Sequence, residues 1–167
     1  MSSELQWVNG PWPGKLALAA RPRGGDWMVD ELADWRSVGV DAVLSLLTPA
    51  EERDLDIENE SREVEARGMQ FLSFPIADRQ APEAQTEVAV LLERLDADLF
   101  AGKNVVVHCR QGVGRTGLIA ACLLISKGWK PETTLSHLAA ARGIPVPKTL
   151  KQRCWIELFS TVLTNAG

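Results

Sequence analysis

The residues with the clearest chemical potential lie together between His108 and Gly117. In this stretch five residues separate a cysteine, Cys109, from an arginine, Arg115, and glycines lie between them. A short β-branched run precedes the stretch and a long apolar run follows it, which predicts a strand, a tight turn and a helix. N–H groups of such a turn converge on an anion, and the helix N-terminus adds unpaired N–H groups and the positive end of its dipole. The spacing therefore favours a receptor for an oxyanion such as phosphate.

The side chains of the turn fit that receptor and add a nucleophile to it. Arg115 can offer two parallel N–H bonds to two phosphate oxygens, and Gly112 and Gly114 can adopt a positive φ without obstructing the anion. The same positive field stabilises a thiolate at Cys109, because cysteines at helix N-termini and near cations ionise more easily. We predict a phosphate-binding loop that comprises Arg110, Gln111, Gly112, Val113, Gly114 and Arg115.

Other interpretations of the turn explain less of it. Gly112, Gly114 and Gly117 match a dinucleotide-binding fingerprint, but the chain lacks the acidic residue that should end a following strand. A nucleotide triphosphate loop of the same length would need glycine in place of Cys109 and lysine in place of Arg115. If Cys109 were only a small buried core residue, the arginine and the glycines would have no explanation. These three remain as alternatives.

Three segments of the chain resemble one enzyme family. Residues 108–117 resemble, at every fixed position, the signature of the cysteine-dependent protein phosphatases, His-Cys-x-x-Gly-x-Gly-Arg-Ser/Thr-Gly. Residues 74–78, with an aspartate 31 positions before Cys109, resemble the general-acid loop of the compact dual-specificity members. Residues 149–152 and the helix predicted after them resemble the C-terminal segment of the kinase-associated phosphatase and its bacterial relatives. The chain has no tyrosine, so it lacks the tyrosine that bounds the deep pocket of the large tyrosine-specific enzymes.

This resemblance implies a phosphomonoester hydrolase that acts on phosphotyrosine, and also on phosphoserine or phosphothreonine, in proteins. It implies a phosphocysteine intermediate and no metal or other cofactor. Cys109 would be the nucleophile, Arg115 the phosphate ligand, and Asp78 the general acid and then the base, with Asp54 and Asp56 as fallback acids. The remaining expected roles are a hydrogen bond to the sulfur from Thr116, orientation of the loop by His108 and positioning of the hydrolytic water by Gln152.

Two other functions stay open at this point. A phosphatase of small molecules, such as an inositol phosphate, a nucleotide or a lipid headgroup, would use the same loop. The acidic balance of the chain and the single extra cation in the loop, Arg110, weigh against a polyphosphorylated ligand. An inactive module that only binds phosphorylated partners is the third function, but such a module would not need Cys109, Arg115 and Asp78 together.

The composition is that of one globular domain, which we expect to span residues 1–167, with an irregular lead-in or a short edge strand at 1–14. The chain is 46% hydrophobic and 24% charged with a net charge of −4, which argues against nucleic acid as the main partner. No apolar run reaches the roughly 20 residues of a membrane span, and the first residues do not resemble a signal peptide. Three widely spaced cysteines and two histidines suggest neither disulfides nor a metal site, so we expect a cytoplasmic, metal-free monomer.

Strands alternate with helices along the whole chain. This order predicts an α/β fold with a central, mostly parallel sheet of about four to five strands and helices on both faces, and the resemblance implies a protein-tyrosine-phosphatase-like fold. Ligands bind at the carboxyl ends of the strands in such sheets, which is where the turn after the last strand lies. We predict strands at 15–20, 40–47, 71–76 and 104–108, and helices at 26–38, 48–68, 83–101, 115–127, 132–141 and 149–163.

Overall fold

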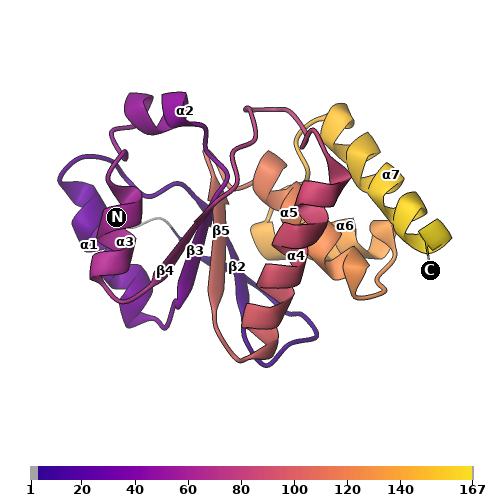
Figure 1. Cartoon of the computed structure of the whole chain (residues 1–167), viewed down its shortest axis with the longest axis horizontal. Coiled ribbons are helices and arrows are strands. Elements are labelled where there is room, and N and C mark those ends of the chain that lie inside the picture. The colour runs from indigo at the N-terminus through magenta and orange to yellow at the C-terminus, as the bar shows by residue number, and fades with distance from the viewer. Residues whose placement is uncertain (1–3, 167) are drawn as a thin grey trace.

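The computed structural model describes residues 4–166, which form a five-stranded sheet between two layers of helices (Figure 1). The strand order is β1-β2-β5-β3-β4; β1 is antiparallel to β2, and the other neighbours are parallel. The predicted, mostly parallel α/β fold is therefore confirmed. The strands are β1 (Gln6–Val8), β2 (Leu16–Ala20), β3 (Ala42–Ser45), β4 (Gln70–Ser73) and β5 (Val105–Cys109).

The central strand β5 is buried along its whole length, because it lies between β2 and β3 and helices cover both of its faces. Its run of three valines suits such a strand, since parallel strands buried on both sides need apolar side chains in both directions. Alternate valines face opposite cores: Val105 and Val107 pack on one side of the sheet and Val106 on the other. The strand ends at Cys109, so the fold delivers this cysteine to the carboxyl edge of the sheet.

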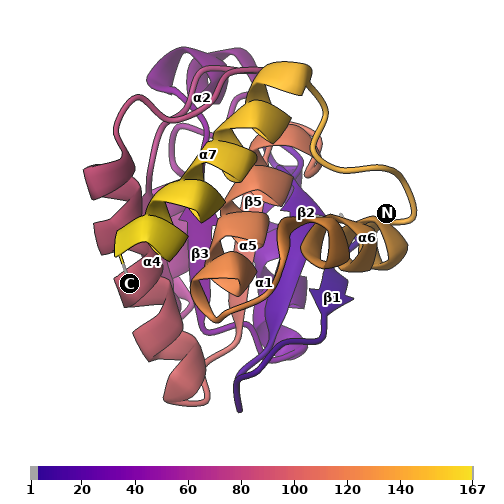
Figure 2. The same ribbon diagram turned by 90° about the vertical axis from the view of Figure 1, so that its right-hand side faces the viewer.

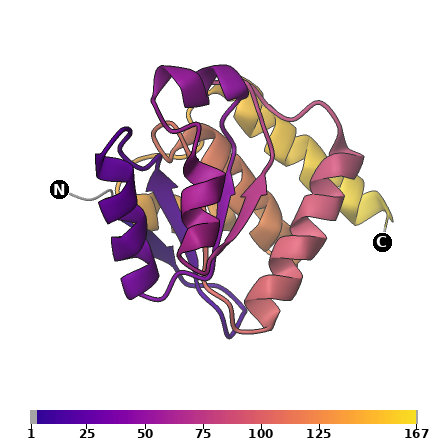
Figure 3. The same ribbon diagram turned by 60° about the vertical axis from the view of Figure 1, so that its left-hand side comes forward.

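Helices cover the two faces of the sheet unequally. Helices α4, α6 and α7 pack on one face around α5, which is buried at every position from Gly114 to Ile125 (Figure 2). Helices α1 and α3 cover the other face, where Leu32, Trp35 and Val64 pack against the sheet (Figure 3). The helices are α1 (Trp27–Ser37), α2 (Pro49–Asp54), α3 (Glu60–Ala66), α4 (Gln85–Phe100), α5 (Gly114–Ser126), α6 (Pro131–Arg142) and α7 (Leu150–Ala166).

The structure corrects several predicted boundaries. The helix expected over 48–68 is two helices, because the chain turns between them at Asp56, which has a φ of 56°. The strand expected over 71–76 ends before Phe74-Pro75, where proline cannot donate a ladder hydrogen bond. Within the lead-in predicted at 1–14, residues 6–8 form the edge strand β1, and residues 1–3 lie outside the described part.

None of the described helices is both long enough and apolar enough to cross a membrane. This agrees with the absence of a long apolar run in the sequence.

Candidate active site

The predicted anion-binding turn joins β5 to α5 at the carboxyl edge of the sheet. Gly112 has a φ of 74°, and a Cβ at this position would lie 2.5 Å from the backbone of Ala19 in the neighbouring strand β2. Two carbonyl oxygens of the turn are held from outside, because Arg142 donates to Gln111 O at 3.0 Å and to Gly112 O at 3.2 Å. The first N–H groups of α5 have no partner within the helix, so the turn presents them at its mouth.

Cys109 lies at the base of the turn, with 3% of its surface exposed. Burial alone raises the pKa of its thiol, but hydrogen bonds from Thr116, the charge of Arg115 and the backbone at Gly112 outweigh burial and lower that pKa. The buried Thr116 hydroxyl has no hydrogen-bond partner among the described residues, so its expected bond to the sulfur stays a prediction. Cys122, in the middle of α5, shows the contrast, since burial without such partners raises its pKa.

Arg115 is a buried cation, 1% exposed, with carboxylates on two sides. Its Nη1 and Nη2 donate to the two carboxylate oxygens of Glu51 at 2.6 and 2.8 Å, and Nη1 also donates to Ile76 O at 2.7 Å. Nη2 donates in addition to Asp78 Oδ1 at 3.1 Å. The guanidinium is therefore held in one orientation by residues from α2 and from the segment after β4.

Glu51 owes its position to the start of α2. Thr48 caps this helix, Pro49 occupies its first turn, and Glu51 closes a capping box with Thr48. Burial raises the pKa of Glu51, but the hydrogen bonds and charge of Arg115, together with Thr48, outweigh burial and lower that pKa. The capping box thus directs the Glu51 carboxylate toward Arg115, the residue that we expect to bind phosphate.

Asp78 lies on the segment between β4 and α4, beside the turn. Its side chain is 54% exposed and forms the ion pair with Arg115. The segment is fastened to the start of α7, because Thr149 donates to Arg79 O at 3.3 Å and Gln152 donates to Gln80 O at 3.1 Å. Asp54 and Asp56, the fallback acids, do not line the hollow around Cys109.

His108 lies under the turn and is fully buried. Its Nε2 lies 2.6 Å from a carboxylate oxygen of Glu60, the first residue of α3, and its Nδ1 lies 3.3 Å from Cys109 O. Burial lowers the pKa of His108, but Glu60 outweighs burial and raises that pKa above its ordinary value. The imidazole thus lies between Glu60 and the backbone of the cysteine, while the orienting role expected of His108 stays a prediction.

Gln152, in the first turn of α7, lines the hollow beside the turn. Its side-chain oxygen accepts from the N–H groups of Lys148 and Thr149, both at 3.1 Å, and its side-chain nitrogen donates to Gln80 O. A Cβ on Gly114 would lie 2.8 Å from that side-chain oxygen. The amide of Gln152 therefore joins two walls of the hollow, while its role in placing water stays a prediction.

The predicted residues meet around a small hollow of about 30 Å³. Thr116 and His108 lie beneath its walls, and the side chain of Val113 packs into the apolar core. The hollow is lined by Asp78, Arg79, Cys109, Arg110, Gln111, Gly114, Arg115, Lys148 and Gln152.

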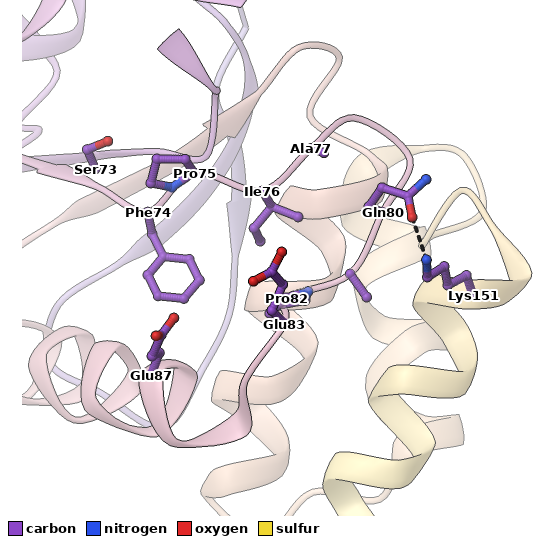
Figure 4. Close-up of a pocket in the computed structure, with 11 residues that line it drawn as sticks. Ser73, Phe74, Pro75, Ile76, Ala77, Gln80, Pro82, Glu83, Glu87 and Lys151 are labelled. Carbon is purple, nitrogen blue, oxygen red and sulfur yellow. Dashed lines mark hydrogen bonds between the residues drawn. The ribbon is translucent and has the colours of Figure 1, made fainter.

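A larger hollow of about 360 Å³ lies beside the segment that connects β4 to α4 (Figure 4). Phe74, Ile76, Glu83 and Glu87 line it, and neither Cys109 nor Arg115 reaches it. The residues predicted to react therefore line the smaller hollow and not the larger one.

Three residues that hold the site were not singled out as site residues in the sequence. The run Thr48-Pro49-Ala50-Glu51 predicts a helix start with a capping box, Glu60 lies in the charged stretch predicted as helix up to residue 68, and Arg142 lies just past the helix predicted at 132–141. The capping box was a signal for the position of Glu51 but not for its contact with Arg115, which is 64 residues away in the chain.

Comparison with known proteins now decides the family. Residues 18–129, which begin within β2 and continue past the turn and α5, match the family described as "Polymorphic toxin system, DSP-PTPase phosphatase". The chain belongs to this DSP-PTPase phosphatase family.

Individual relatives agree with this assignment. The chain is 33% identical over 87 residues to cyclin-dependent kinase inhibitor 3 of Homo sapiens, covering 51% of this chain and 41% of that protein. It is 32% identical over 138 residues to a putative tyrosine phosphatase of Invertebrate iridescent virus 6, covering 76% of this chain and 49% of that protein. The chain thus spans less than half the length of these curated relatives.

Solved structures share the fold of this DSP-PTPase. The kinase associated phosphatase has a TM-score of 0.89 at 23% identity, and the alignment covers 98% of this chain and 97% of that one. TpbA of P. aeruginosa in complex with pTyr has a TM-score of 0.61 at 19% identity, covering 96% and 97%. The protein-tyrosine-phosphatase-like fold expected from the sequence is therefore confirmed.

Proposed function

We propose that this chain is a protein phosphatase that hydrolyses phosphotyrosine, and also phosphoserine and phosphothreonine, through a phosphocysteine. The observation that carries this proposal is the meeting of Cys109, Arg115 and Asp78 around one hollow at the N-terminus of α5. The lowered pKa of the Cys109 thiol favours the thiolate, which is the nucleophilic form. The family assignment supports the same chemistry.

The first step forms a bond between Cys109 Sγ and phosphorus. The bond from phosphorus to the ester oxygen breaks, and that oxygen takes a proton from the Asp78 carboxyl group as it leaves. The N–H groups of the turn and the Arg115 guanidinium hold the three other phosphate oxygens while their charge shifts. The hydrogen bond from Thr116 makes the sulfur a better leaving group in the second step.

The second step releases inorganic phosphate. A water molecule attacks phosphorus and gives a proton to Asp78, which now acts as a base, and the bond from phosphorus to sulfur breaks. The thiolate of Cys109 and the protonated Asp78 are thereby restored. Because the cycle depends on a reduced thiol, we place the protein in a reducing compartment such as the cytoplasm.

The hydrogen bonds of Arg115 imply that a bound phosphate and Asp78 compete for the same donor, Nη2. Glu51 occupies the end-on pair of guanidinium donors, Nη1 and Nη2, so a phosphate must use the side-on pair, Nε and Nη2. Asp78 Oδ1 lies 3.1 Å from that Nη2. We infer that bound phosphate displaces Asp78 from Arg115 and leaves its carboxyl group free to face the leaving oxygen.

The main test measures hydrolysis of p-nitrophenyl phosphate in the presence of EDTA, and of peptides carrying phosphotyrosine, phosphoserine or phosphothreonine. We expect turnover by the wild type, none by Cys109→Ser, and full turnover by Cys154→Ser, which changes an exposed cysteine outside the hollow. Acid quenching with labelled substrate should trap phosphate on Cys109. Binding of phosphopeptides without turnover by the wild type would reject the proposal in favour of an inactive binding module.

Asp78→Ala should separate the two roles of this carboxylate. On an alkyl phosphate at neutral pH we expect kcat to fall by roughly 10²–10⁴-fold, because the leaving oxygen loses its proton donor. The inhibition constant of inorganic phosphate should fall as well, because a competitor for Arg115 has been removed. Asp54→Ala is the matched control and should keep both constants. An unchanged kcat in Asp78→Ala, or a loss in Asp54→Ala, would show that the acid has been misassigned.

A further inference from the structure

Two cations at the rim of the catalytic hollow have no role in the steps described above. Arg79 follows Asp78 on the segment between β4 and α4, and Lys148 lies on the segment between α6 and α7. Both are exposed, and both line the same hollow as Cys109. They therefore lie on two different walls around the position of the scissile phosphate.

The backbone at both rim cations is fixed by contacts between these walls. Thr149, next to Lys148, donates its hydroxyl to Arg79 O, although 70 residues separate the two in sequence. Gln152 accepts from Lys148 N and donates to Gln80 O, so one side chain ties both walls together. The two cations thus start from neighbouring, anchored points, and only their side chains need to be ordered by a ligand.

The rim cations also lack acidic partners. Among residues 4–166, neither Arg79 nor Lys148 forms an ion pair with a carboxylate, and Lys148 Nζ contacts only the neutral amide oxygen of Gln111, at 2.6 Å. Arg110, on the opposite wall, differs because its Nη1 lies 3.9 Å from Glu51. In a chain with a net charge of −4, two cations without acidic partners beside the reactive thiol mark a place for a second anion.

We propose that Arg79 and Lys148 form a subsite for an acidic side chain next to the phosphorylated residue of a peptide substrate. This inference rests on the proposed phosphatase function. The hollow itself holds little more than one phosphate, so the second anion must bind at the rim. The planar guanidinium of Arg79 suits a carboxylate, which it can bind with two parallel hydrogen bonds, and Lys148 adds a point charge.

The test compares pairs of phosphotyrosyl peptides that differ only in Glu or Gln, or Asp or Asn, at the residues flanking phosphotyrosine. For the wild type at low ionic strength we expect kcat/KM to be roughly three- to tenfold higher for the acidic peptide of each pair, as two exposed charge pairs allow. Added salt should reduce this ratio, because exposed charges are screened.

The variant Arg79→Ser/Lys148→Ser should bring the ratio of kcat/KM close to one, and Arg79→Glu/Lys148→Glu should invert it. Because the ratio is taken within one variant, it is unaffected by any general loss of activity. Arg79→Lys/Lys148→Arg, which keeps both charges, should keep most of the preference. Arg62→Ser, an exposed cation on α3 outside the hollow, removes one charge from the chain and should leave the ratio unchanged.

The possible failures can be told apart. If p-nitrophenyl phosphate and all peptides are left intact, the proposed function is wrong. If they are hydrolysed but wild type shows equal kcat/KM for acidic and amide peptides, only the subsite is wrong. If a soluble inositol bisphosphate is hydrolysed with a higher kcat/KM than every acidic peptide, and this advantage is lost in Arg79→Ser/Lys148→Ser, the cations serve a second phosphate and the assignment to peptides is overturned.

Discussion

The guanidinium of Arg115 is buried, and Glu51 supplies the negative charge that makes this burial tolerable. Removing one partner of a buried pair typically costs about 3–5 kcal/mol, because the other charge is left unpaired in a medium of low polarity. Here the expected cost falls at the low end of that range, since Asp78 and a bound phosphate can also neutralise Arg115. We therefore expect both the stability of the fold and the proposed catalysis to depend on Glu51.

Glu51→Gln should lower the melting temperature and reduce kcat/KM by more than tenfold, because the amide is neutral and turns an NH2 donor toward one of the two Nη donors. Saturating phosphate should recover more of the melting temperature in this variant than in wild type, since the anion takes over the neutralising role. Glu58→Gln, an exposed change in the connection between α2 and α3, is the control. Equal stability and kcat/KM in Glu51→Gln and wild type would contradict this assignment.

The contact between His108 in β5 and Glu60 in α3 links the sheet to the layer formed by α1 and α3. Since the pKa of His108 is raised in the folded protein, its contribution to stability is complete below its unfolded value, 6.5, and is lost as pH rises through the raised pKa. Glu52 also faces this pair, and its own pKa is raised by burial and by the charge of Glu60. Protonated His108 and ionised Cys109 favour each other, so the pair also acts on the nucleophile.

Glu60→Gln should therefore raise the pKa of Cys109, measured as the midpoint of the rate of alkylation by iodoacetamide against pH. Its loss of stability relative to wild type should be largest near pH 6 and smaller at alkaline pH. A merely structural role would lower stability equally at every pH and leave the alkylation midpoint in place. Glu63→Gln, on the same helix and paired with Arg67, should change neither profile.

At the scale of elements, the turn between β5 and α5 keeps its shape because β2 and α6 hold it from outside. Gly112 lies against the backbone of Ala19 in β2, and Arg142 at the end of α6 binds two carbonyl oxygens of the turn. The turn therefore needs its neighbours as well as its own glycines. Its N–H groups can converge on an anion only while both neighbours stay in place.

Gly112→Ala should lower kcat/KM strongly and also destabilise the fold, because the new Cβ would meet the backbone of β2 at 2.5 Å. Gly128→Ala is a matched control, since Gly128 also has a positive φ, 97°, but a Cβ there meets nothing within 4 Å. The control should lose about 1 kcal/mol of stability from backbone strain and keep its kcat/KM. Similar kinetic losses in both variants would point to strain instead of the contact with β2.

At the scale of the whole molecule, the site forms where the two layers of helices meet at the carboxyl edge of the sheet. Glu51 and Glu60 come from the connection after β3, whereas Gln152 and Lys148 come from the layer around α5. An anion bound in the turn contacts only the folded protein, because no isolated segment carries all of these groups. Binding must therefore stabilise the whole fold.

Inorganic phosphate at 100 times its dissociation constant should add about 2.7 kcal/mol to the free energy of unfolding. The measurement is thermal unfolding with phosphate against sodium chloride at equal ionic strength. Arg115→Lys should show a smaller gain, because lysine lacks the paired donors of guanidinium. An equal increase in melting temperature with chloride would mean that phosphate acts only as a general salt.

The sequence by itself determined the α/β order and the position of the turn from His108 to Gly117 between a strand and a helix. These features are local: a β-branched run, closely spaced glycines and an apolar helix need only neighbouring residues to form. The strand order places the loop of Asp78 at the same edge of the sheet as the turn, whereas the role of Asp78 as an acid follows only from the family resemblance. The helix expected over 48–68 was wrong in the middle, because a single residue with a positive φ, Asp56, divides it.

Tertiary structure alone decided which charges meet around the turn. Arg115 pairs with Glu51, which lies 64 residues away in the chain, and His108 pairs with Glu60, 48 residues away. The Thr149 hydroxyl donates to the backbone oxygen of Arg79, 70 residues away. Such contacts depend on how helices pack on the sheet, and no periodic pattern in the chain records them. A carboxylate in a charged helix looks the same in sequence whether it faces water or a buried cation, so only the folded chain could identify Glu51 and Glu60.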